Sequence, residues 1–182
     1  MSIHNITVFG AEGIGSQIAL RAAIYGYKVL LFDVNEPALT RAMARIREIS
    51  CGFGKARGLT AKEIETVLGN IACTINMAEA SKDADIIIEA ALEDEPVKKS
   101  FYQLLGRVTP EKAIFATSPA TLLSSAIVQE SGRPDRLLAL HFDEELFRSN
   151  AAGVGGHAAT APQSIQKVTE FIKAIGMVVQ QV

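Results

Sequence analysis

The chain has 182 residues, of which 48% are hydrophobic and 21% charged, the composition of an ordinary globular protein with enough apolar residues for a core. Its 18 basic and 20 acidic residues leave a net charge of −2, which excludes the broad basic surface that binds nucleic acids or anionic membranes. We expect one domain covering residues 1–182.

The most apolar stretch, residues 18–34, is interrupted by Arg21, Lys28 and Asp33. No segment reaches the roughly 18 uncharged residues that a membrane span needs, so we expect no membrane association. The start of the chain has no basic region before its first apolar run, which predicts a cytoplasmic protein without a secretory signal.

The residues that most often bind metals lie far apart. Cys51 and Cys73 lack the paired spacing of a zinc site, and we expect both to be buried or inert thiols. His4 and His157 have no carboxylate or imidazole at ligand spacing. The sequence therefore predicts no metal site.

Short aliphatic runs alternate with amphipathic segments along the whole chain, a pattern typical of βαβ units. The runs predicted as strands are Ile6–Phe9, Val29–Phe32, Ile71–Ile75, Ile86–Ile88, Ile114–Ala116, Leu137–Leu140 and Met177–Val179. The segments predicted as helices are Gly15–Tyr25, Pro37–Ile49, Ala61–Leu68, Pro96–Val108, Leu122–Gln129 and Pro162–Ile175. Together they predict an α/β fold: a doubly wound, mostly parallel sheet of about seven strands, as in the Rossmann fold, with helices on both faces.

Several helix boundaries have local signals. Pro37, Pro96 and Pro162 fall near predicted first turns, and Asn35 is a candidate cap for the second helix. Gly176 is placed to end the last helix.

One segment, Asp143–Thr160, is first polar and then rich in small residues and glycine. This composition predicts a long, mobile loop after the sixth strand. Loops at strand ends of an α/β sheet are where functional sites are assembled.

A glycine-rich turn follows the first predicted strand and precedes a helix, the context in which such a turn binds a dinucleotide. Gly10 fits the tight turn and Gly15 the close packing of helix on strand, while Gly13 and Ile14 lie at the helix N-terminus, where N–H groups bind phosphate. Glu12 occupies the position that the pattern reserves for a second glycine, and its charge opposes phosphate binding.

The acidic residue expected of this motif is Asp33, 18 residues after Gly15, where a carboxylate accepts both ribose hydroxyls and repels a 2′-phosphate. The cofactor predicted is therefore NAD rather than NADP. An alternative register uses Gly13, Gly15 and Ala19. The alternative interpretation is that this turn binds no ligand and is only a tightly packed corner between strand and helix. Asp33 would then be a solvated acid at the end of a strand.

Six segments resemble, in this order, the NAD-binding domain of the 3-hydroxyacyl-CoA dehydrogenase family. They are VFGAEGIGSQIA, LFDVNEPALTRAMARI, DADIIIEAALEDEPVKKSFYQLL, AIFATSPATL, RPDRLLALHF and EFIKAIGMVV. The resemblance covers nearly the whole chain. It implies hydride transfer between the 3-hydroxyl carbon of an acyl-CoA and NAD in fatty acid metabolism, with His141 as acid/base and Glu93 and Lys98 near cofactor and substrate. As a structural alternative, the acidic stretch at 93–95 is a solvated helix start.

The chain departs from the family at two catalytic positions. The family orients its His with a Glu twelve residues downstream, where this chain has Gly153. Glu144 or Glu145 could orient His141 instead.

The second departure concerns the family's catalytic Ser, whose position is occupied by Ala120. Thr121 could supply the missing hydroxyl. The resemblance also implies a helical C-terminal domain of roughly 100 residues, which supplies much of the acyl-CoA cleft in the family. We expect residues 1–182 to form the NAD-binding domain alone, with that helical domain absent.

Three functions remain open from the sequence. The first is a weakened NAD-dependent oxidoreductase acting on a small molecule, an acyl-CoA, with the site completed by a second copy or a partner chain. The second is a non-catalytic module that binds a dinucleotide or CoA. The third is a purely structural domain whose nucleotide cleft is closed by Glu12.

Overall fold

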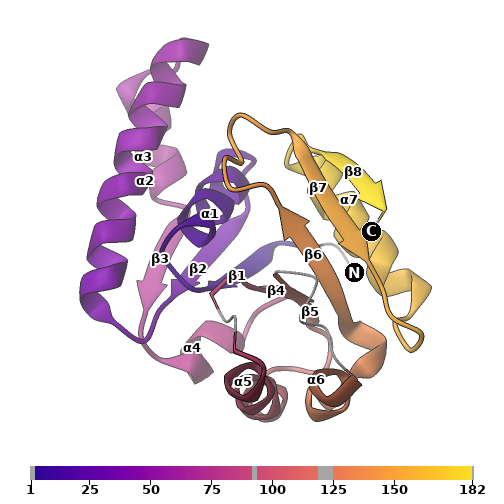
Figure 1. Cartoon of the computed structure of the whole chain (residues 1–182). Coiled ribbons are helices and arrows are strands. Elements are labelled where there is room, and N and C mark those ends of the chain that lie inside the picture. Colours follow the sequence, from indigo (N-terminus) through magenta and orange to yellow (C-terminus); the bar gives the residue numbers. More distant parts are fainter. Residues whose placement is uncertain (1–2, 92–93, 119–124, 182) are drawn as a thin grey trace.

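The computed structural model describes residues 3–91, 94–118 and 125–181. Its eight strands form one sheet in the order β3-β2-β1-β4-β5-β6-β7-β8 (Figure 1). Their bounds are β1 Asn5–Phe9, β2 Lys28–Phe32, β3 Ile71–Thr74, β4 Ile86–Glu89, β5 Ile114–Thr117, β6 Leu137–Phe142, β7 Ala151–Gly155 and β8 Val178–Gln181. Neighbours are parallel except β6 and β7. The predicted mostly parallel α/β fold is confirmed.

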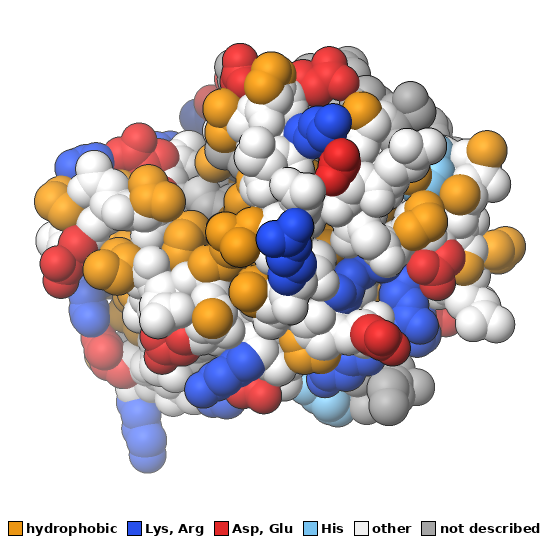
Figure 2. Space-filling model, turned by 90° about the horizontal axis from the view of Figure 1, so that it is seen from below, with side chains coloured by type: hydrophobic (Ala, Val, Ile, Leu, Met, Phe, Trp, Pro, Cys, Tyr) orange, Lys and Arg blue, Asp and Glu red, His pale blue; other side chains and the backbone are white. Residues whose placement is uncertain are grey.

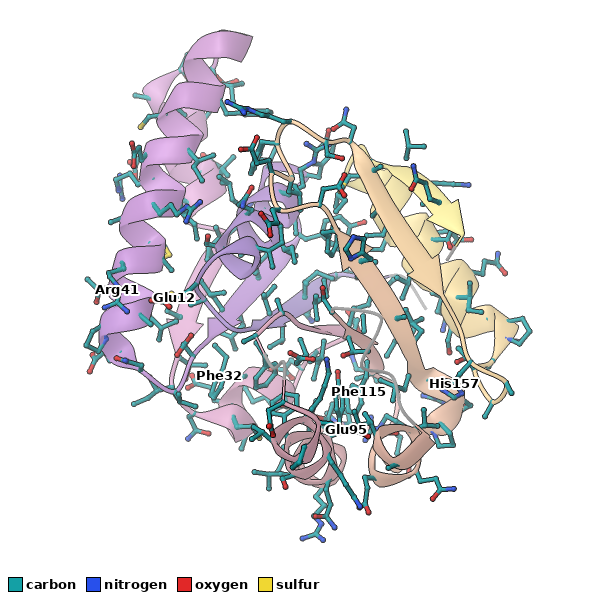
Figure 3. All side chains as sticks on the ribbon, viewed as in Figure 1. Glu12, Phe32, Arg41, Glu95, Phe115 and His157 are labelled. Carbon is teal, nitrogen blue, oxygen red and sulfur yellow. The ribbon has the colours of Figure 1, made fainter. Side chains whose placement is uncertain are left out.

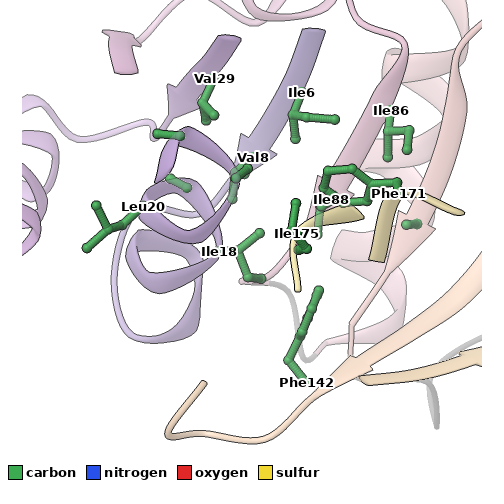
Figure 4. Close-up of a cluster of buried hydrophobic side chains, with 14 of the residues drawn as sticks. Ile6, Val8, Ile18, Leu20, Val29, Ile86, Ile88, Phe142, Phe171 and Ile175 are labelled. Carbon is green, nitrogen blue, oxygen red and sulfur yellow. The ribbon is translucent and has the colours of Figure 1, made fainter. Parts of the chain in front are cut away.

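Helices cover both faces of this sheet, as predicted (Figure 1). The larger hydrophobic cluster packs α1, α2 and α7 against one face, and the smaller packs α4, α5 and α6 against the other. Figure 4 shows part of the larger cluster. The helices span α1 Ile14–Ile24, α2 Glu36–Arg57, α3 Ala61–Leu68, α4 Met77–Ser81, α5 Glu95–Val108, α6 Ser125–Glu130 and α7 Pro162–Ala174, with a 3₁₀ turn at Pro134–Arg136.

The central strands are apolar throughout because both of their sides are buried. In β4, Ile86 and Ile88 belong to the larger cluster and Ile87 to the smaller one. Successive side chains of a strand point to opposite faces, so Ile86 and Ile88 contribute to one core and Ile87 to the other.

The helix starts marked by proline agree with the structure to within one residue. Pro162 is the first residue of α7, and Pro37 and Pro96 are the second residues of α2 and α5. The Asn35 carbonyl accepts the first backbone hydrogen bonds of α2, from N–H groups 3.0 and 3.3 Å away. Gly176 has a φ of +76°, which glycine adopts without strain as the chain leaves α7.

The prediction of about seven strands and a mobile loop at 143–160 is wrong in one respect: residues 151–155 form β7. The segment reads AAGVG, in which alanine and glycine carry little strand propensity. Pairing with β6 and β8 overrides that weakness, and it buries Ala152 and Val154 to 2% and 1% exposure.

The segment between β6 and β7 is also held in place. Gln17 of α1 donates to the Glu144 carbonyl at 2.8 Å and accepts from the Leu146 N–H at 3.1 Å. Leu146 is completely buried, and Phe147 contacts Phe53 of α2 edge to face. These contacts hold the segment between β6 and β7 against α1 and α2.

Helix α2 extends to Arg57, well past the predicted end at Ile49, and it contains two glycines that the sequence pattern did not favour in a helix. A Cβ at Gly54 would lie 2.7 Å from the Ile64 side chain of α3. The close packing of α2 on α3 therefore accounts for this glycine.

Two smaller expectations also need correction. Cys51 on α2 and Cys73 on the edge strand β3 are both exposed, which rules out burial, the first of the two alternatives expected for these thiols. Partial burial still raises the pKa of Cys73. The short helix α4 was not predicted, and residues 122–124 of the predicted sixth helix lie outside the described residues.

Within the described ranges, no helix combines the length and apolar character needed to cross a bilayer. Figure 2 shows the face formed around α4, α5 and α6, where apolar, acidic and basic side chains are interspersed. This face therefore carries no extended surface of one charge.

Candidate functional site

The glycine-rich turn lies between β1 and α1 at the carboxyl edge of the parallel strands, where α/β sheets bind ligands. Gly10 has a φ of +98°, and a Cβ there would lie 2.4 Å from the Ala91 Cβ. A Cβ at Gly15 would lie only 1.8 Å from the Gly10 carbonyl oxygen. Both positions therefore require glycine, one for the turn and one for close packing of the helix on the strand.

Helix α1 begins at Ile14 with Gly13 as its N-cap and no side-chain cap. Among the described residues, the N–H groups of Gly13 and Ile14 have no backbone acceptor. A Cβ at Gly13 would meet nothing within 4 Å. The positions where a Cβ would collide with its surroundings are thus Gly10 and Gly15, which favours the register that uses these two glycines over the shifted register that uses Gly13, Gly15 and Ala19. The N–H groups of Gly13 and Ile14 remain available to donate hydrogen bonds to a phosphate.

Glu12, the residue in place of the second glycine, extends toward α2 (Figure 3). Its Oε1 accepts a hydrogen bond from the Arg41 guanidinium at 2.5 Å, and both side chains are more than half exposed. The carboxylate is thereby paired with an opposite charge.

Asp33 directly follows β2 and faces the same turn. Its Oδ2 accepts from the Ala11 N–H at 3.0 Å, and its Oδ1 accepts from the Asn35 N–H at 3.1 Å. An ionised carboxylate has about four lone-pair positions, so two hydrogen bonds leave acceptor capacity for hydroxyl groups.

An apolar cavity of about 130 Å³ lies beside Asp33 at the ends of β1, β2 and β4. Its walls include Phe9, Phe32, Val34 and Phe101. Phe9 packs against the other two rings at centroid distances of 4.5 and 5.2 Å. A planar apolar group next to a ribose would suit this cavity, so turn, acid and cavity together fit a dinucleotide. A larger cavity of about 540 Å³ between α2 and β3 lies away from the turn.

Lys98 does not reach the surface. Its Nζ lies 2.9 Å from Glu89 Oε2, with the two side chains 0% and 1% exposed, and it also donates to the Ser118 carbonyl at 3.3 Å. Thr117 donates to the same carboxylate. The predicted contact of Lys98 with cofactor or substrate stays a prediction, and Glu93 lies outside the described residues.

This buried ion pair also affects a neighbouring phenol. Tyr102 is 1% exposed, and burial together with the charge of Glu89 raises its pKa well above the ordinary value of 10.0. The hydroxyl is therefore protonated at any physiological pH.

His141 lies on β6, one residue before its end, and is exposed. Because β6 runs parallel to β5, His141 is at the same edge of the sheet as the glycine-rich turn. In the antiparallel ladder its direct partner is Gly153 of β7. Directly opposed residues of a ladder have neighbouring side chains, so a carboxylate at 153 would lie beside the imidazole. Gly153 has no side chain beyond hydrogen, so no carboxylate lies there.

One of the two acidic residues considered as replacements is engaged elsewhere, because Glu145 pairs with Arg148 at 2.8 Å. For Glu144, Gln17 binds the backbone carbonyl and not the carboxylate. Within the described part of the chain, no hydrogen bond joins His141 to either carboxylate. The positions of the family's serine, Ala120, and of Thr121 lie outside the described residues.

Sequence reasoning missed the basic side chains of α2 that face the turn. A cavity of about 340 Å³ in front of α1 is lined in part by Glu12, Arg41 and Arg45. The spacing of four residues between the two arginines was an available signal, because it places both on one helix face. Among the described residues, no group of three His, Cys, Asp or Glu side chains is arranged to hold a metal ion.

The glycine-rich turn, the acid after the second strand and the mostly parallel sheet are the features of a dinucleotide-binding domain of the Rossmann type. Residues 5–182 match the family described as "3-hydroxyacyl-CoA dehydrogenase, NAD binding domain". The chain therefore belongs to the 3-hydroxyacyl-CoA dehydrogenase family and corresponds to its NAD-binding domain.

Individual relatives agree with this assignment. The chain is 30% identical to the 3-hydroxyadipyl-CoA dehydrogenase of Escherichia coli K12 over 97% of its own length and 37% of the relative. It is 28% identical to the mitochondrial hydroxyacyl-coenzyme A dehydrogenase of Homo sapiens, over 96% of this chain and 57% of that one. A solved diketoreductase structure, described as catalysing reactions of dicarbonyl compounds, superposes with a TM-score of 0.94 at 39% identity, over 100% of this chain and 65% of that one. The chain thus spans between about a third and two thirds of these relatives.

Proposed function

We propose that this chain is the cofactor-binding part of an NAD-dependent oxidoreductase that interconverts a 3-hydroxyacyl thioester and its 3-oxo form. The observation that carries the proposal is the cradle at Gly10–Gly15, in which two Cβ positions are blocked by backbone or Cβ atoms and the N-terminus of α1 is open. The relatives named for acyl-CoA dehydrogenation supply the substrate class.

In this proposal the turn residues Gly10, Gly13, Ile14 and Gly15 hold the diphosphate, and Asp33 accepts hydrogen bonds from the adenosine ribose. The negative charge of Asp33 disfavours a 2′-phosphate, so NAD is preferred over NADP. Bound NAD supplies the hydride acceptor.

His141 would exchange the proton of the substrate hydroxyl. Positioned acid–base catalysis of this kind contributes roughly 10²- to 10⁴-fold. Because Gly153 offers no carboxylate to orient the imidazole, we expect turnover to be slow.

The relation to the diketoreductase is chemically consistent with this substrate class. A 3-oxoacyl thioester carries two carbonyl groups separated by one carbon, so it is itself a dicarbonyl compound. The same site would therefore serve a thioester or a simpler 1,3-dicarbonyl.

The named relatives are longer than this chain, and we include in the proposal that another chain or a second copy completes the substrate cleft. Val34 beside the Asp33 cavity is 85% exposed, an apolar surface that such a partner would cover. A strictly monomeric protein by light scattering at high concentration, without a partner, would contradict self-association. A cytoplasmic location belongs to the same proposal.

The first test is calorimetric titration with NADH and NADPH. We expect micromolar binding of NADH, weaker binding of NADPH, and loss of NADH binding in Asp33→Ala, with Asp33→Asn as the milder replacement. Oxidation of NADH in the presence of a short-chain 3-oxoacyl-CoA then tests the reaction. Binding without turnover would instead support a non-catalytic dinucleotide-binding module, and a folded protein that binds neither dinucleotide would refute the proposal.

A further inference from the structure

Glu12 and Arg41 form the one feature of the turn that the dinucleotide motif does not explain. Glu12 stands where the motif has glycine, and Arg41 reaches it from α2, 29 residues later in the chain. The nitrogen–oxygen distance is 2.5 Å, with side-chain exposures of 61% for Arg41 and 64% for Glu12. Figure 3 shows the two side chains next to each other between the turn and the helix.

The surroundings of this pair are otherwise positive. The cavity of about 340 Å³ in front of α1 has one carboxylate, Glu12, and two guanidinium groups, Arg41 and Arg45, on its walls. The N-terminus of α1 adds the positive end of the helix dipole. A diphosphate at the turn would therefore meet a more favourable field when the Glu12 charge is compensated than when it is not.

We propose that Arg41 is a positioning residue of the cofactor site, which holds the Glu12 carboxylate against α2 and offsets its charge. A glutamate is thereby tolerated at a position that the phosphate motif reserves for glycine. The inference rests on the proposed binding of a dinucleotide, and it adds that affinity depends on a side chain outside the motif.

The effect expected is moderate because the pair is exposed to water. A carboxylate left uncompensated several ångströms from a diphosphate weakens binding by roughly three- to tenfold at low salt, and screening reduces this factor at high salt. Removing the carboxylate removes the repulsion altogether.

The experiment is a double-mutant cycle read as the dissociation constant of NADH at low and high ionic strength. The proteins are the unmodified chain, Glu12→Gly, Arg41→Ala and the double variant. We expect Arg41→Ala to bind roughly three- to tenfold more weakly, Glu12→Gly to bind at least as well as the unmodified chain, and the double variant to match Glu12→Gly. Arg41→Lys should recover most of the loss, because it restores the charge.

Arg47→Ala is the matched control. Arg47 lies on the same helix and pairs with Glu65 of α3 at 2.6 Å, with exposures of 58% and 62%, but it does not line the cavity at the turn. Arg47→Ala also removes one exposed arginine–glutamate ion pair from α2, but it should leave NADH binding unchanged. Thermal melts of all variants separate loss of binding from loss of fold.

The outcomes discriminate between the inference and the proposed function. Unchanged affinity in Arg41→Ala overturns the inference. An equal loss with and without Glu12 also overturns it, because Arg41 would then act on the ligand directly. If neither the unmodified chain nor Glu12→Gly binds NADH while both are folded, the proposed function itself fails.

Discussion

The buried ion pair beneath the candidate site leads to the most demanding prediction. Lys98 and Glu89 are 0% and 1% exposed, and their charged atoms lie 2.9 Å apart. The carboxylate also accepts hydrogen bonds from Thr117 at 2.9 Å and from the Ala91 N–H at 3.0 Å. Replacing Lys98 by Met keeps an unbranched side chain in the same space but leaves a buried carboxylate without its cation.

Removing one partner of a buried pair costs about 3–5 kcal/mol, out of a total stability of about 5–15 kcal/mol for a typical domain. For a chain of this length each kcal/mol lowers the midpoint of thermal unfolding by about 2–4 °C, so Lys98→Met should lower it by about 6–20 °C. The measurement is urea unfolding followed by far-ultraviolet circular dichroism, together with a thermal melt.

Lys99→Met is the matched control, because it removes the same charge from the next residue of α5. Lys99 lies 3.3 Å from Glu130, and the two side chains are 46% and 31% exposed. We expect a loss of at most about 1 kcal/mol. The double variant Lys98→Met with Glu89→Gln, which removes both charges, should recover part of the stability. A loss below about 1 kcal/mol for Lys98→Met, or equal losses for both lysines, would refute the reasoning.

Three further predictions concern the turn, the histidine and the pH dependence of folding. Gly15→Ala places a Cβ against a backbone carbonyl and should cost about 3 kcal/mol or more in urea unfolding, whereas Gly52→Ala, with open space in α2, should be neutral or stabilising. Gly153→Glu installs a carboxylate opposite His141 and should raise turnover of a 3-oxoacyl-CoA about tenfold, whereas Gly153→Ala should not; equal rates for both would contradict the assigned register. Partial burial opposes the charge of Asp85, but a lysine ammonium and two backbone N–H groups outweigh it and lower its pKa below 3.8. Its contribution is therefore present above about pH 4 and lost as the pH falls further, so Asp85→Asn should destabilise the protein at pH 7 and converge with the unmodified chain near pH 2.

The parts of the fold that depend on local patterns were predictable. Apolar runs such as Ile86–Ile88 and the proline-marked helix starts depend on neighbouring residues, and the structure confirms them. The turn at Gly10–Gly15 was recognisable because its glycine spacing follows a known motif and comes directly after a predicted strand. The contact that requires Gly15 is local, with the Gly10 carbonyl, whereas the one that requires Gly10 comes from Ala91 and could not be read from the sequence.

Other features needed the tertiary structure. Strand β7 has a sequence too poor in β-branched residues to be predicted, and it forms because β6 and β8 provide hydrogen-bond partners on both sides. The extension of α2 depends on a glycine that fits against Ile64 of α3. The exposure of Cys51 and Cys73 follows from where α2 and the sheet edge lie, which no local pattern encodes.

The site divides in the same way. The sequence by itself indicated the glycine-rich turn, Asp33 as the acid of the motif, and Gly153 at the position where the family has a glutamate, because motif spacing carries this information. Only the tertiary structure decided that Arg41 pairs with Glu12 and that Lys98 is buried against Glu89. Electrostatic interactions act through space between residues distant in the chain, so the charge of a side chain can be read from the sequence but its partner cannot.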